Sequence, residues 1–139
     1  MALDEQRTSF PVTRIDRGHE VWFRGVHSDV GGGNGNAGLH DITLRWMFRK
    51  AKAAGLPIND ADIAVANAGA NSDTRIDQHF FGPDRQVRGR DLIHYSVDRS
   101  LVLDGARKHV PPVCPGETEA DELLAQSVAE IVAAEGGGG

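Results

Sequence analysis

The sequence has one cysteine, few aromatic residues and no long apolar run. Cys114 alone cannot form an internal disulfide, so the cysteine content gives no sign of an oxidising compartment. No apolar stretch approaches the roughly 18–20 residues of a membrane span, and the N-terminus lacks the apolar segment of a signal peptide. These absences predict a cytoplasmic protein and leave open export without a cleaved signal. With aromatic residues at 6%, we expect a mainly aliphatic core.

Basic residues are also too few and too scattered for a nucleic-acid surface. The formal net charge is −5, whereas phosphate neutralisation needs clustered lysine and arginine. The one local group, on a predicted helix, is interpreted as a solvated helix face and comprises Arg45, Arg49, Lys50 and Lys52. The 139 residues, 40% of them apolar, suffice for one domain with a core. We therefore predict a single domain over residues 1–135 and a glycine tail over 136–139.

The first half of the chain predicts a strand, a glycine-rich loop and a helix after an irregular lead-in at 1–19. Residues 21–26, Val-Trp-Phe-Arg-Gly-Val, favour a buried strand because they are nearly all apolar and rich in β-branched and aromatic types. Residues 27–40 are expected to form a loop. Asp41 is a candidate N-cap, and apolar spacing predicts a helix over 41–54 that ends at Gly55. Its apolar stripe is expected to comprise Ile42, Leu44, Trp46, Met47, Phe48 and Ala51.

The second half gives weaker signals. Residues 63–70 fit either a helix or a strand, and 71–90 are expected to be loop with a turn at Gly82-Pro83-Asp84. A helix is predicted around 96–101, followed by an extended proline-rich connector over 111–116. Thr118 and Asp121 have the spacing of a capping box, which predicts a final helix ending at Gly136.

His27 is the candidate catalytic residue, because it directly follows the predicted buried strand. Open α/β sheets place their ligand crevices at the carboxyl ends of such strands, and an imidazole there can act as a general base near neutral pH. Gly31, Gly32 and Gly33 would let the backbone turn sharply beside it, since glycine tolerates positive φ. Asp29 is expected to orient this loop or to hydrogen-bond a neighbour.

The residues around His27 resemble a family of α/β-hydrolase proteins that includes the phospholipase effectors of the bacterial type VI secretion system. The resemblance lies in Trp-Phe-Arg-Gly-Val-His-Ser-Asp-Val-Gly-Gly-Gly at 22–33 and Gly-Leu-His-Asp-Ile-Thr-Leu-Arg-Trp-Met at 38–47. The lead-in Ala-Leu-Asp-Glu-Gln-Arg at 2–7 and Ile-His with Ser-Val and Arg over 93–99 also agree. It covers residues 2–54, and 91–99 more loosely. It implies a serine hydrolase acting on esters or lipids, with His27 as the triad histidine.

The chain departs from this family in two ways. No serine lies in a Gly-x-Ser-x-Gly elbow, and the resemblance implies that the triad acid comes from an earlier strand. We therefore predict a partial α/β-hydrolase-like three-layer sandwich, the C-terminal segment with the last core strand and flanking helices. Such a segment would be inactive alone and completed by self-association or by a partner chain that supplies the nucleophile.

Two alternatives remain open. His27, Asp29, His40 and Asp41 offer nitrogen and oxygen ligands for a metal, although our main interpretation involves neither a metal nor a cofactor. The chain could also be a non-catalytic remnant, a binding module or one subunit of a split enzyme. The other candidate histidines, His79, His94 and His109, have no supporting pattern and are interpreted as surface or core-edge residues.

Overall fold

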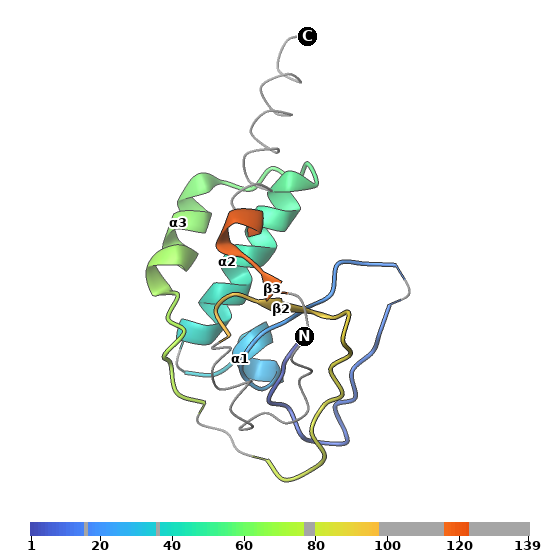
Figure 1. Cartoon of the computed structure of the whole chain (residues 1–139). Coiled ribbons are helices and arrows are strands. Elements are labelled where there is room, and N and C mark those ends of the chain that lie inside the picture. The colour runs from blue at the N-terminus through green and yellow to red at the C-terminus, as the bar shows by residue number, and fades with distance from the viewer. Residues whose placement is uncertain (16, 36, 77–79, 98–115, 123–139) are drawn as a thin grey trace.

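A small parallel sheet lies at the centre of the molecule (Figure 1). The computed structural model describes residues 1–15, 17–35, 37–76, 80–97 and 116–122. Its strands are β1 (Val21–Trp22), β2 (Leu92–His94) and β3 (Gly116–Glu117), in the order β1-β2-β3 with both pairs parallel. Val21 is in register with Leu92, and Ile93 with Gly116. Parallel strands combined with helices confirm the predicted α/β class.

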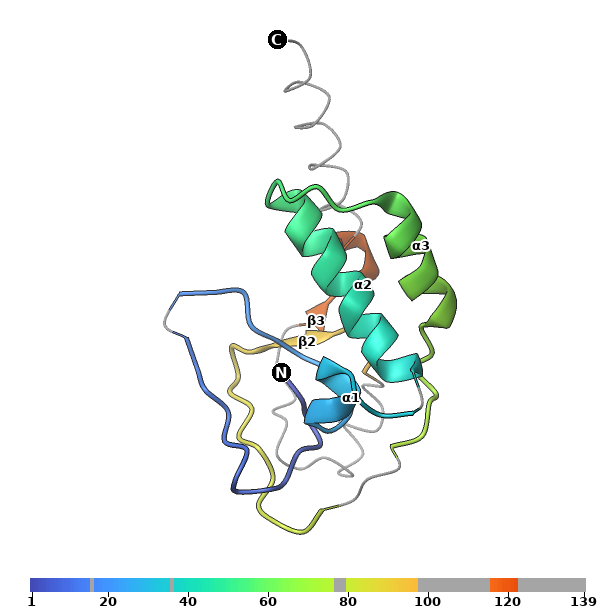
Figure 2. The same ribbon diagram turned by 180° about the vertical axis from the view of Figure 1, so that it is seen from behind.

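Three helices lie between β1 and β2 in the chain. They are α1 (His27–Gly31), α2 (Gly38–Ala53) and α3 (Asp60–Gly69). Seen from behind, α2 and α3 run side by side, while α1 lies near one end of α2 (Figure 2). The helices therefore form a layer beside the sheet. On its opposite face, buried residues of the irregular segments, Leu3, Val87 and Val97, pack against Trp22 and Ile93.

Alternation along β1 directs its side chains to both faces of the sheet. Val21 and Phe23 pack with residues of α2, including Ile42 and Trp46, whereas Trp22 belongs to the cluster on the other face. Because neither face of β1 is open to solvent, the near-continuous apolar sequence of this strand is explained. The predicted buried strand is thus confirmed, although the strand proper is shorter than 21–26.

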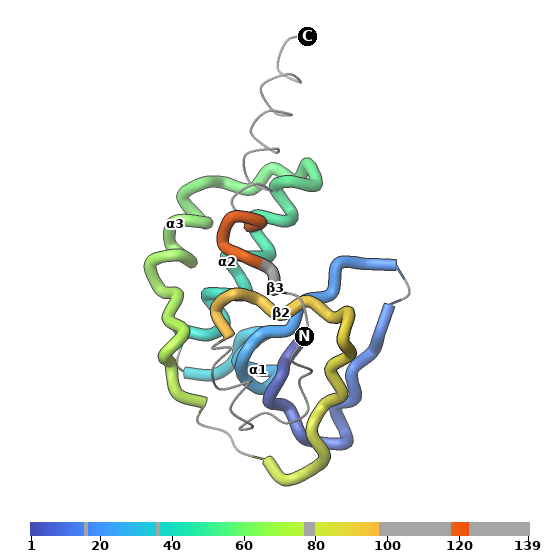
Figure 3. The backbone as a smooth tube through the Cα atoms, viewed as in Figure 1, coloured from blue at the N-terminus to red at the C-terminus, as the bar shows by residue number. Residues whose placement is uncertain are grey.

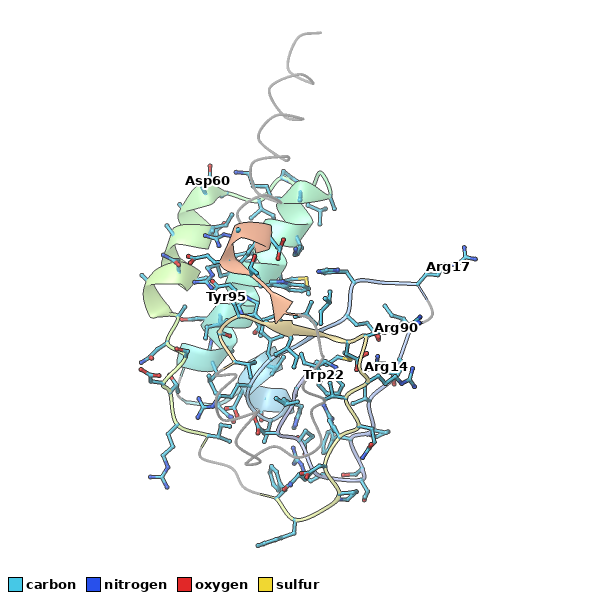
Figure 4. The ribbon with its side chains drawn as sticks, viewed as in Figure 1. Arg14, Arg17, Trp22, Asp60, Arg90 and Tyr95 are labelled. Atoms are coloured by element: carbon cyan, nitrogen blue, oxygen red, sulfur yellow. The ribbon has the colours of Figure 1, made fainter. Side chains whose placement is uncertain are left out.

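The side chain of Trp22 is anchored by a buried carboxylate. Its indole Nε1 donates to Asp91 Oδ2 at 2.9 Å, and Arg14 Nη2 donates to Asp91 Oδ1 at 2.5 Å. Trp22 and Arg14 project into the same region of the molecule, while Arg17 points outward (Figure 4). Asp91 thus holds the Trp22 side chain and the Arg14 side chain together on one face of the sheet.

The first residues of the chain run parallel to the segment Phe23–Gly25, which directly follows β1. Leu3 N–H donates to Phe23 O at 2.9 Å and Asp4 N–H to Gly25 O at 3.0 Å, around a parallel bridge between Ala2 and Phe23. The expected irregular lead-in is confirmed for residues 1–15 and 17–19, which contain no helix or strand, with the isolated bridge at Ala2 as an addition. The pairing matters because it carries the residues after Asp4 to the carboxyl end of β1.

A second irregular segment, residues 80–91, lies beside the N-terminal one (Figure 3). Arg85 Nη1 donates to Ala2 O at 2.7 Å, and Gln6 Nε2 donates to Asp84 Oδ1 at 2.8 Å. The expected absence of helix and strand over 71–90 is confirmed for 71–76 and 80–90, with a bend at Gly82. These contacts hold the N-terminal segment against the body of the protein.

The predicted second helix is confirmed, with corrected bounds. It begins at Gly38 after Ala37, so Asp41 is not the N-cap but lies in the first turn, where a carboxylate favours the helix dipole. The predicted end is confirmed: Gly55 has φ 92°, its N–H donates to Lys52 O at 2.9 Å, and Leu56 N–H donates to Ala51 O at 3.0 Å. These are the two bonds of a Schellman motif.

The buried face of α2 differs from the predicted stripe. Leu44 and Met47 are 38% and 55% exposed, whereas Arg45, expected on the solvated face, is only 9% exposed. The buried face is instead built around Leu39, Ile42 and Trp46. Arg45 tolerates burial because its Nε donates to Glu122 Oε1 at 3.0 Å, a partner far away in the sequence. Periodicity alone could not reveal that pair.

The remaining predictions concern the chain after α2. The choice left open at 63–70 is resolved as helix, with the Asn59 side chain accepting from Ala61 N–H at 2.9 Å. β2 was not predicted, and Ser96 and Val97 lie in a turn after it, so no helix begins at 96. Thr118 and Asp121 form the predicted capping box and open a helical turn. The rest of the predicted helices, most of the 111–116 connector and the tail at 136–139 lie outside the described residues.

Candidate active site around His27

His27 lies just beyond the carboxyl end of β1, at the first residue of α1. The expected loop over 27–40 is therefore wrong at both ends, because residues 27–31 form one helical turn and residues 38–40 belong to α2. Gly25 makes the sharp entry to this turn, with φ 115°, and a Cβ there would approach Asp29 Cβ to 2.5 Å. The side chain of His27 is 43% exposed. The structure thus presents the imidazole to solvent at the position the sequence predicts.

The His27 ring is held by a buried carboxylate. Its Nδ1 lies 2.8 Å from Glu5 Oε2, and its backbone N–H donates to the same oxygen at 3.3 Å. The Glu5 side chain is fully buried. Within the described ranges, the hydrogen bonds to the ring are made at Nδ1 and none at Nε2. The arrangement fixes one ring nitrogen inside the protein.

Arg7 holds Glu5 from the other side. Its Nε donates to Glu5 Oε1 at 2.9 Å and its Nη2 to Oε2 at 2.8 Å, a two-point pairing that suits guanidinium and carboxylate. These hydrogen bonds hold the pKa of the Glu5 carboxyl far below its usual range, against the opposing effect of burial and with help from His27. Glu5 is therefore an anion throughout the pH range in which an imidazole titrates.

Aromatic rings complete the setting. Phe10 stacks on the His27 ring with centroids 4.4 Å apart, and the Arg7 guanidinium lies 4.2 Å from the Phe10 centroid and 3.8 Å from that of Phe80. A guanidinium between two ring faces is favourable and is restricted in its rotation. His27, Glu5 and Arg7 are thus positioned by packing as well as by hydrogen bonds.

Sequence reasoning missed Glu5, although it lies in the 2–7 segment that carries part of the family resemblance. The separation of 22 residues from His27 gave no periodic signal. The one available signal is the position of an acid two residues before an arginine, at the end of a segment that pairs with β1. Neither feature would identify Glu5 without the parallel pairing of residues 1–4.

The supporting residues predicted around His27 lie on the inner side of the turn. Asp29 is 1% exposed, and its carboxylate accepts from Val26 N–H at 2.9 Å and from the Asn34 amide. Gly32 and Gly33 have φ of 89° and 117°, values that favour glycine, whereas Gly31 ends α1 without a positive φ. Asp29 therefore faces the backbone of the loop and not the His27 ring.

The residues considered for a metal do not converge. His27 pairs with Glu5, Asp29 with the loop backbone, and His40 Nε2 with Asp41 Oδ1 at 3.1 Å. Within the part of the chain that the structure describes, no three histidine, cysteine, aspartate or glutamate residues lie close enough to hold a metal ion. The geometry therefore gives this alternative no support.

The remaining candidate residues divide between the core and undescribed segments. His94 is fully buried, and the expectation of a surface or core-edge residue is wrong. Its Nδ1 lies 2.7 Å from Ser96 Oγ and its Nε2 lies 3.3 Å from Glu122 Oε2. His79, His109 and Cys114 lie outside the described residues.

An apolar groove of about 680 Å³ runs along β1, α1 and α2. Its lining includes Val21, Phe23, Val30, Trp46, Ile15 and Met47. Ile15 and Met47 are 56% and 55% exposed, which gives the groove an apolar rim. Val30 belongs to α1, the short helix that begins at His27, although His27 itself does not line the groove. A groove of this size and lining suits an aliphatic ligand.

Comparison with known proteins gives one match, and it covers the segment that contains this site. No curated protein and no solved structure matches the chain. Among the helices described, none is long and apolar enough to cross a membrane. A family model described as "T6SS, Phospholipase effector Tle1-like, catalytic domain" matches residues 1–50 of the 139, which confirms the predicted family resemblance there, whereas the resemblance at 91–99 stays a prediction. Over the segment that holds Glu5 and His27, the chain is thus similar to the catalytic domain of the Tle1-like phospholipase effectors of the type VI secretion system.

Proposed function

We propose that this chain supplies the histidine base of a serine hydrolase that cleaves ester bonds in lipids. The observation that carries the proposal is the placement of His27: it lies past the carboxyl end of a buried parallel strand, with its ring exposed and hydrogen-bonded at Nδ1. The match of residues 1–50 to a phospholipase catalytic domain supports the choice of reaction. His27 lies inside the matched residues, so the two observations support the same proposal.

In this role His27 acts through Nε2. The imidazole takes the proton of a serine hydroxyl as that oxygen attacks the ester carbonyl, and it later returns the proton to the departing alcohol. Both transfers require a ring nitrogen that can meet substrate while the other keeps the ring in place. The hydrogen bonding of His27 at Nδ1 provides the second condition.

The serine comes from another stretch of polypeptide. The sequence contains no Gly-x-Ser-x-Gly elbow, the strand-to-helix turn that exposes the nucleophile in α/β-hydrolases. We therefore expect this chain to be nearly inactive by itself. Loss of a triad member lowers kcat by roughly 10⁴- to 10⁶-fold relative to a complete triad.

A lipid is the favoured substrate class because of the apolar groove. The groove lies along α1 and α2, and its exposed rim residues, Ile15 and Met47, are suited to an acyl chain. Covering these residues with a hydrocarbon would remove apolar surface from water, at roughly 25 cal/mol per Å². The ester at the end of such a chain is the bond we expect to be cleaved.

The test is complementation. The chain is combined with the polypeptide encoded immediately upstream, and hydrolysis of phospholipid vesicles and of a short-chain ester is measured. We expect activity only in the mixture, and His27→Ala should lower kcat by about 10⁴-fold or more without unfolding the protein. His109→Gln is the matched control, because the sequence assigns that histidine no role. Activity retained by His27→Ala would overturn the proposal, and a mixture inactive on every ester would favour a binding module or remnant.

A further inference from the structure

A second cavity, of about 260 Å³, adjoins the N-terminal segment and is separate from the apolar groove. Its lining consists of three arginines, one glutamine and one valine: Arg14, Arg85, Arg88, Gln86 and Val12. We propose that this arginine pocket binds a phosphate group, and that this group belongs to the phospholipid whose acyl chain occupies the apolar groove. The lipid's role as substrate rests on the proposed function, whereas phosphate binding is a property of this chain alone.

The polar groups of the arginine pocket select an anion. Guanidinium groups only donate hydrogen bonds, and the described residues that line the pocket include no aspartate or glutamate. A ligand there must therefore supply acceptors and negative charge. A phosphate group fits best, because its oxygens point in several directions and can accept from guanidinium groups on different parts of the chain. A planar carboxylate, in contrast, is already satisfied by one guanidinium.

Arg85 supplies a guanidinium whose hydrogen-bond partners are neutral. Its Nη1 donates to Ala2 O at 2.7 Å and its Nη2 donates to Phe10 O at 2.6 Å. These bonds use two of the five N–H donors of the side chain. Burial lowers the pKa of Arg85, with the charge of Glu5 acting in the opposite direction. A bound anion would offset this loss of hydration and accept from the remaining donors.

Asp91 orders two of the other walls of the arginine pocket. Arg14 Nη2 and Nη1 donate to its two carboxylate oxygens at 2.5 and 3.1 Å, and the backbone N–H of Arg88 donates to Oδ2 at 2.8 Å. Asp91 is only 8% exposed and is not among the residues that line the pocket. The charge of Arg14 is offset by Asp91 and by Glu20 at 3.2 Å, so Arg14 mainly shapes the wall. The pocket is therefore formed before any ligand binds.

The segment 12–15 joins the arginine pocket to the apolar groove. Val12 and Arg14 line the pocket, whereas Thr13 and Ile15 line the groove. The two sites therefore share this stretch of chain as a wall, to which alternate residues contribute. A phospholipid has the same division, because glycerol joins its acyl chains to a charged phosphate. One lipid molecule would use both sites, whereas free phosphate would use the pocket alone.

Phe10 connects the arginine pocket with the candidate active site. Its carbonyl oxygen accepts from Arg85, and its ring stacks on the His27 ring with centroids 4.4 Å apart. A single residue thus links the guanidinium to the imidazole. In a phospholipid, the ester and the phosphate are only a few bonds apart on the glycerol. A phosphate bound at Arg85 would therefore keep the ester near His27.

The competing explanation is that these arginines only fasten the N-terminal segment and form a diffuse basic surface. A diffuse surface attracts anions through its total charge, so each arginine on it matters about equally. A pocket depends on the residues that line it. Arg90 separates the two explanations, because it is exposed, lies on the same side of the molecule as Arg14 (Figure 4) and does not line the pocket.

The experiment measures binding of inorganic phosphate and of dihexanoylphosphatidylglycerol, below its micelle concentration, to the full chain by NMR titration at constant ionic strength. Arg88→Gln is compared with Arg90→Gln, since Arg85 also holds Ala2 and Phe10. We expect Arg88→Gln to weaken the binding of both ligands by about 5- to 10-fold, through loss of a charge-assisted hydrogen bond, and Arg90→Gln by less than about twofold. Equal effects of the two variants, or no saturable binding of either ligand, would overturn the proposal.

A variant in the groove decides the source of the phosphate. We expect the lipid to bind more tightly than inorganic phosphate, and Met47→Ser, at the exposed rim, to weaken lipid binding alone by about threefold or more. A lipid that bound no more tightly than inorganic phosphate and ignored Met47→Ser would reject the lipid and leave a site for free phosphate.

Activity separates this inference from the proposed function. In the complemented enzyme, Arg88→Gln should raise KM for phospholipid by about 5- to 10-fold with little change in kcat, because the pocket binds substrate and does not touch the reacting atoms. Lipid binding of the expected pattern with no ester hydrolysis in any mixture would sustain the pocket and reject the proposed function. Phospholipid hydrolysis with an unchanged KM in Arg88→Gln would reject the role of the pocket and leave that of His27 intact.

Discussion

Two histidine–glutamate pairs lie near the ends of neighbouring strands and differ in almost every other respect. His27 follows β1 and contacts Glu5, whereas His94 ends β2 and contacts Glu122. Both glutamate side chains are fully buried, but His27 is 43% exposed and His94 is 0% exposed. The first pair can therefore reach a substrate, and the second is closed to one.

The partners of the two carboxylates reinforce this difference. Glu5 forms an ion pair with Arg7, whereas Glu122 accepts from Arg45 at 3.0 Å and from Arg49 at 2.9 Å. Both ring nitrogens of His94 have partners, one in Ser96 and one in Glu122. The comparison teaches that the two pairs differ in access: the His27 ring is exposed, as a catalytic histidine must be, whereas the His94 ring is sealed. The Glu122 pair instead connects α2, β2 and the turn at 119–122.

The largest stability effect is expected at Glu122. Glu122→Ala should lower the free energy of unfolding by about 3–5 kcal/mol, because it leaves Arg45 and Arg49 buried or half-buried without their carboxylate. Urea unfolding measures the change. Glu119→Ala, at an exposed position in the same helical turn, is the control and should stay within about 0.5 kcal/mol. A loss below about 1 kcal/mol for Glu122→Ala would show that this cluster does not hold the layers together.

The sequence predicted the half of the molecule in which local signals agree. The strand at 21–26, the helix ending at Gly55 and the exposed His27 each depend on residues within a few positions of one another. The short helical turn at 27–31 was missed because its glycines favour a loop, and the side chain of Asp29, which accepts from Val26 N–H, gives the turn its cap. The neighbouring residues thus predicted the position of the histidine correctly but not the backbone conformation around it.

The two carboxylate clusters could not be predicted in this way. Arg45 is separated from Glu122 by 77 residues and Glu5 from His27 by 22, and neither pair leaves a periodic trace. The pairing with Glu122 makes burial of Arg45 tolerable. The buried face of α2 therefore includes Arg45, and Leu44 is left partly exposed. β2 escaped notice because three residues are too short for an alternation signal.

Matched substitutions at the two histidines test the comparison directly. His94→Gln should cost about 2–3 kcal/mol, because the ring is fully buried and its loss leaves a space and unsatisfied partners at Ser96 and Glu122. His27→Gln should cost about 0.5 kcal/mol or less, since the ring is largely exposed and Arg7 continues to neutralise Glu5. Both values come from urea unfolding at neutral pH. Equal costs at the two sites would contradict the division into a sealed and an exposed pair.

The smallest effect should appear as a dependence of stability on pH. Burial alone would raise the pKa of Glu122, but hydrogen bonding from His94 and the charges of Arg45 and Arg49 outweigh it and lower the pKa to about 2. A carboxyl with a depressed folded-state pKa stabilises the protein fully above its unfolded pKa, near 4.3, and loses that contribution as pH falls toward 2. Between pH 5 and pH 3 the loss from Glu122 is on the order of 1–2 kcal/mol.

Glu122→Gln should remove this part of the acid sensitivity, so its unfolding free energy should fall less steeply than that of the unaltered chain over the same interval. The control is Asp60→Asn, because the Asp60 side chain is 70% exposed and its pair with Lys52 at 2.6 Å lies at the surface. Glu5 also has a lowered pKa, from its hydrogen bonds with Arg7, so some acid sensitivity should persist in Glu122→Gln. If the unfolding free energies of Glu122→Gln and the unaltered chain fell equally steeply with pH, the pKa of Glu122 would not be lowered in the folded protein. The contrast between the two pairs would then rest on solvent access alone.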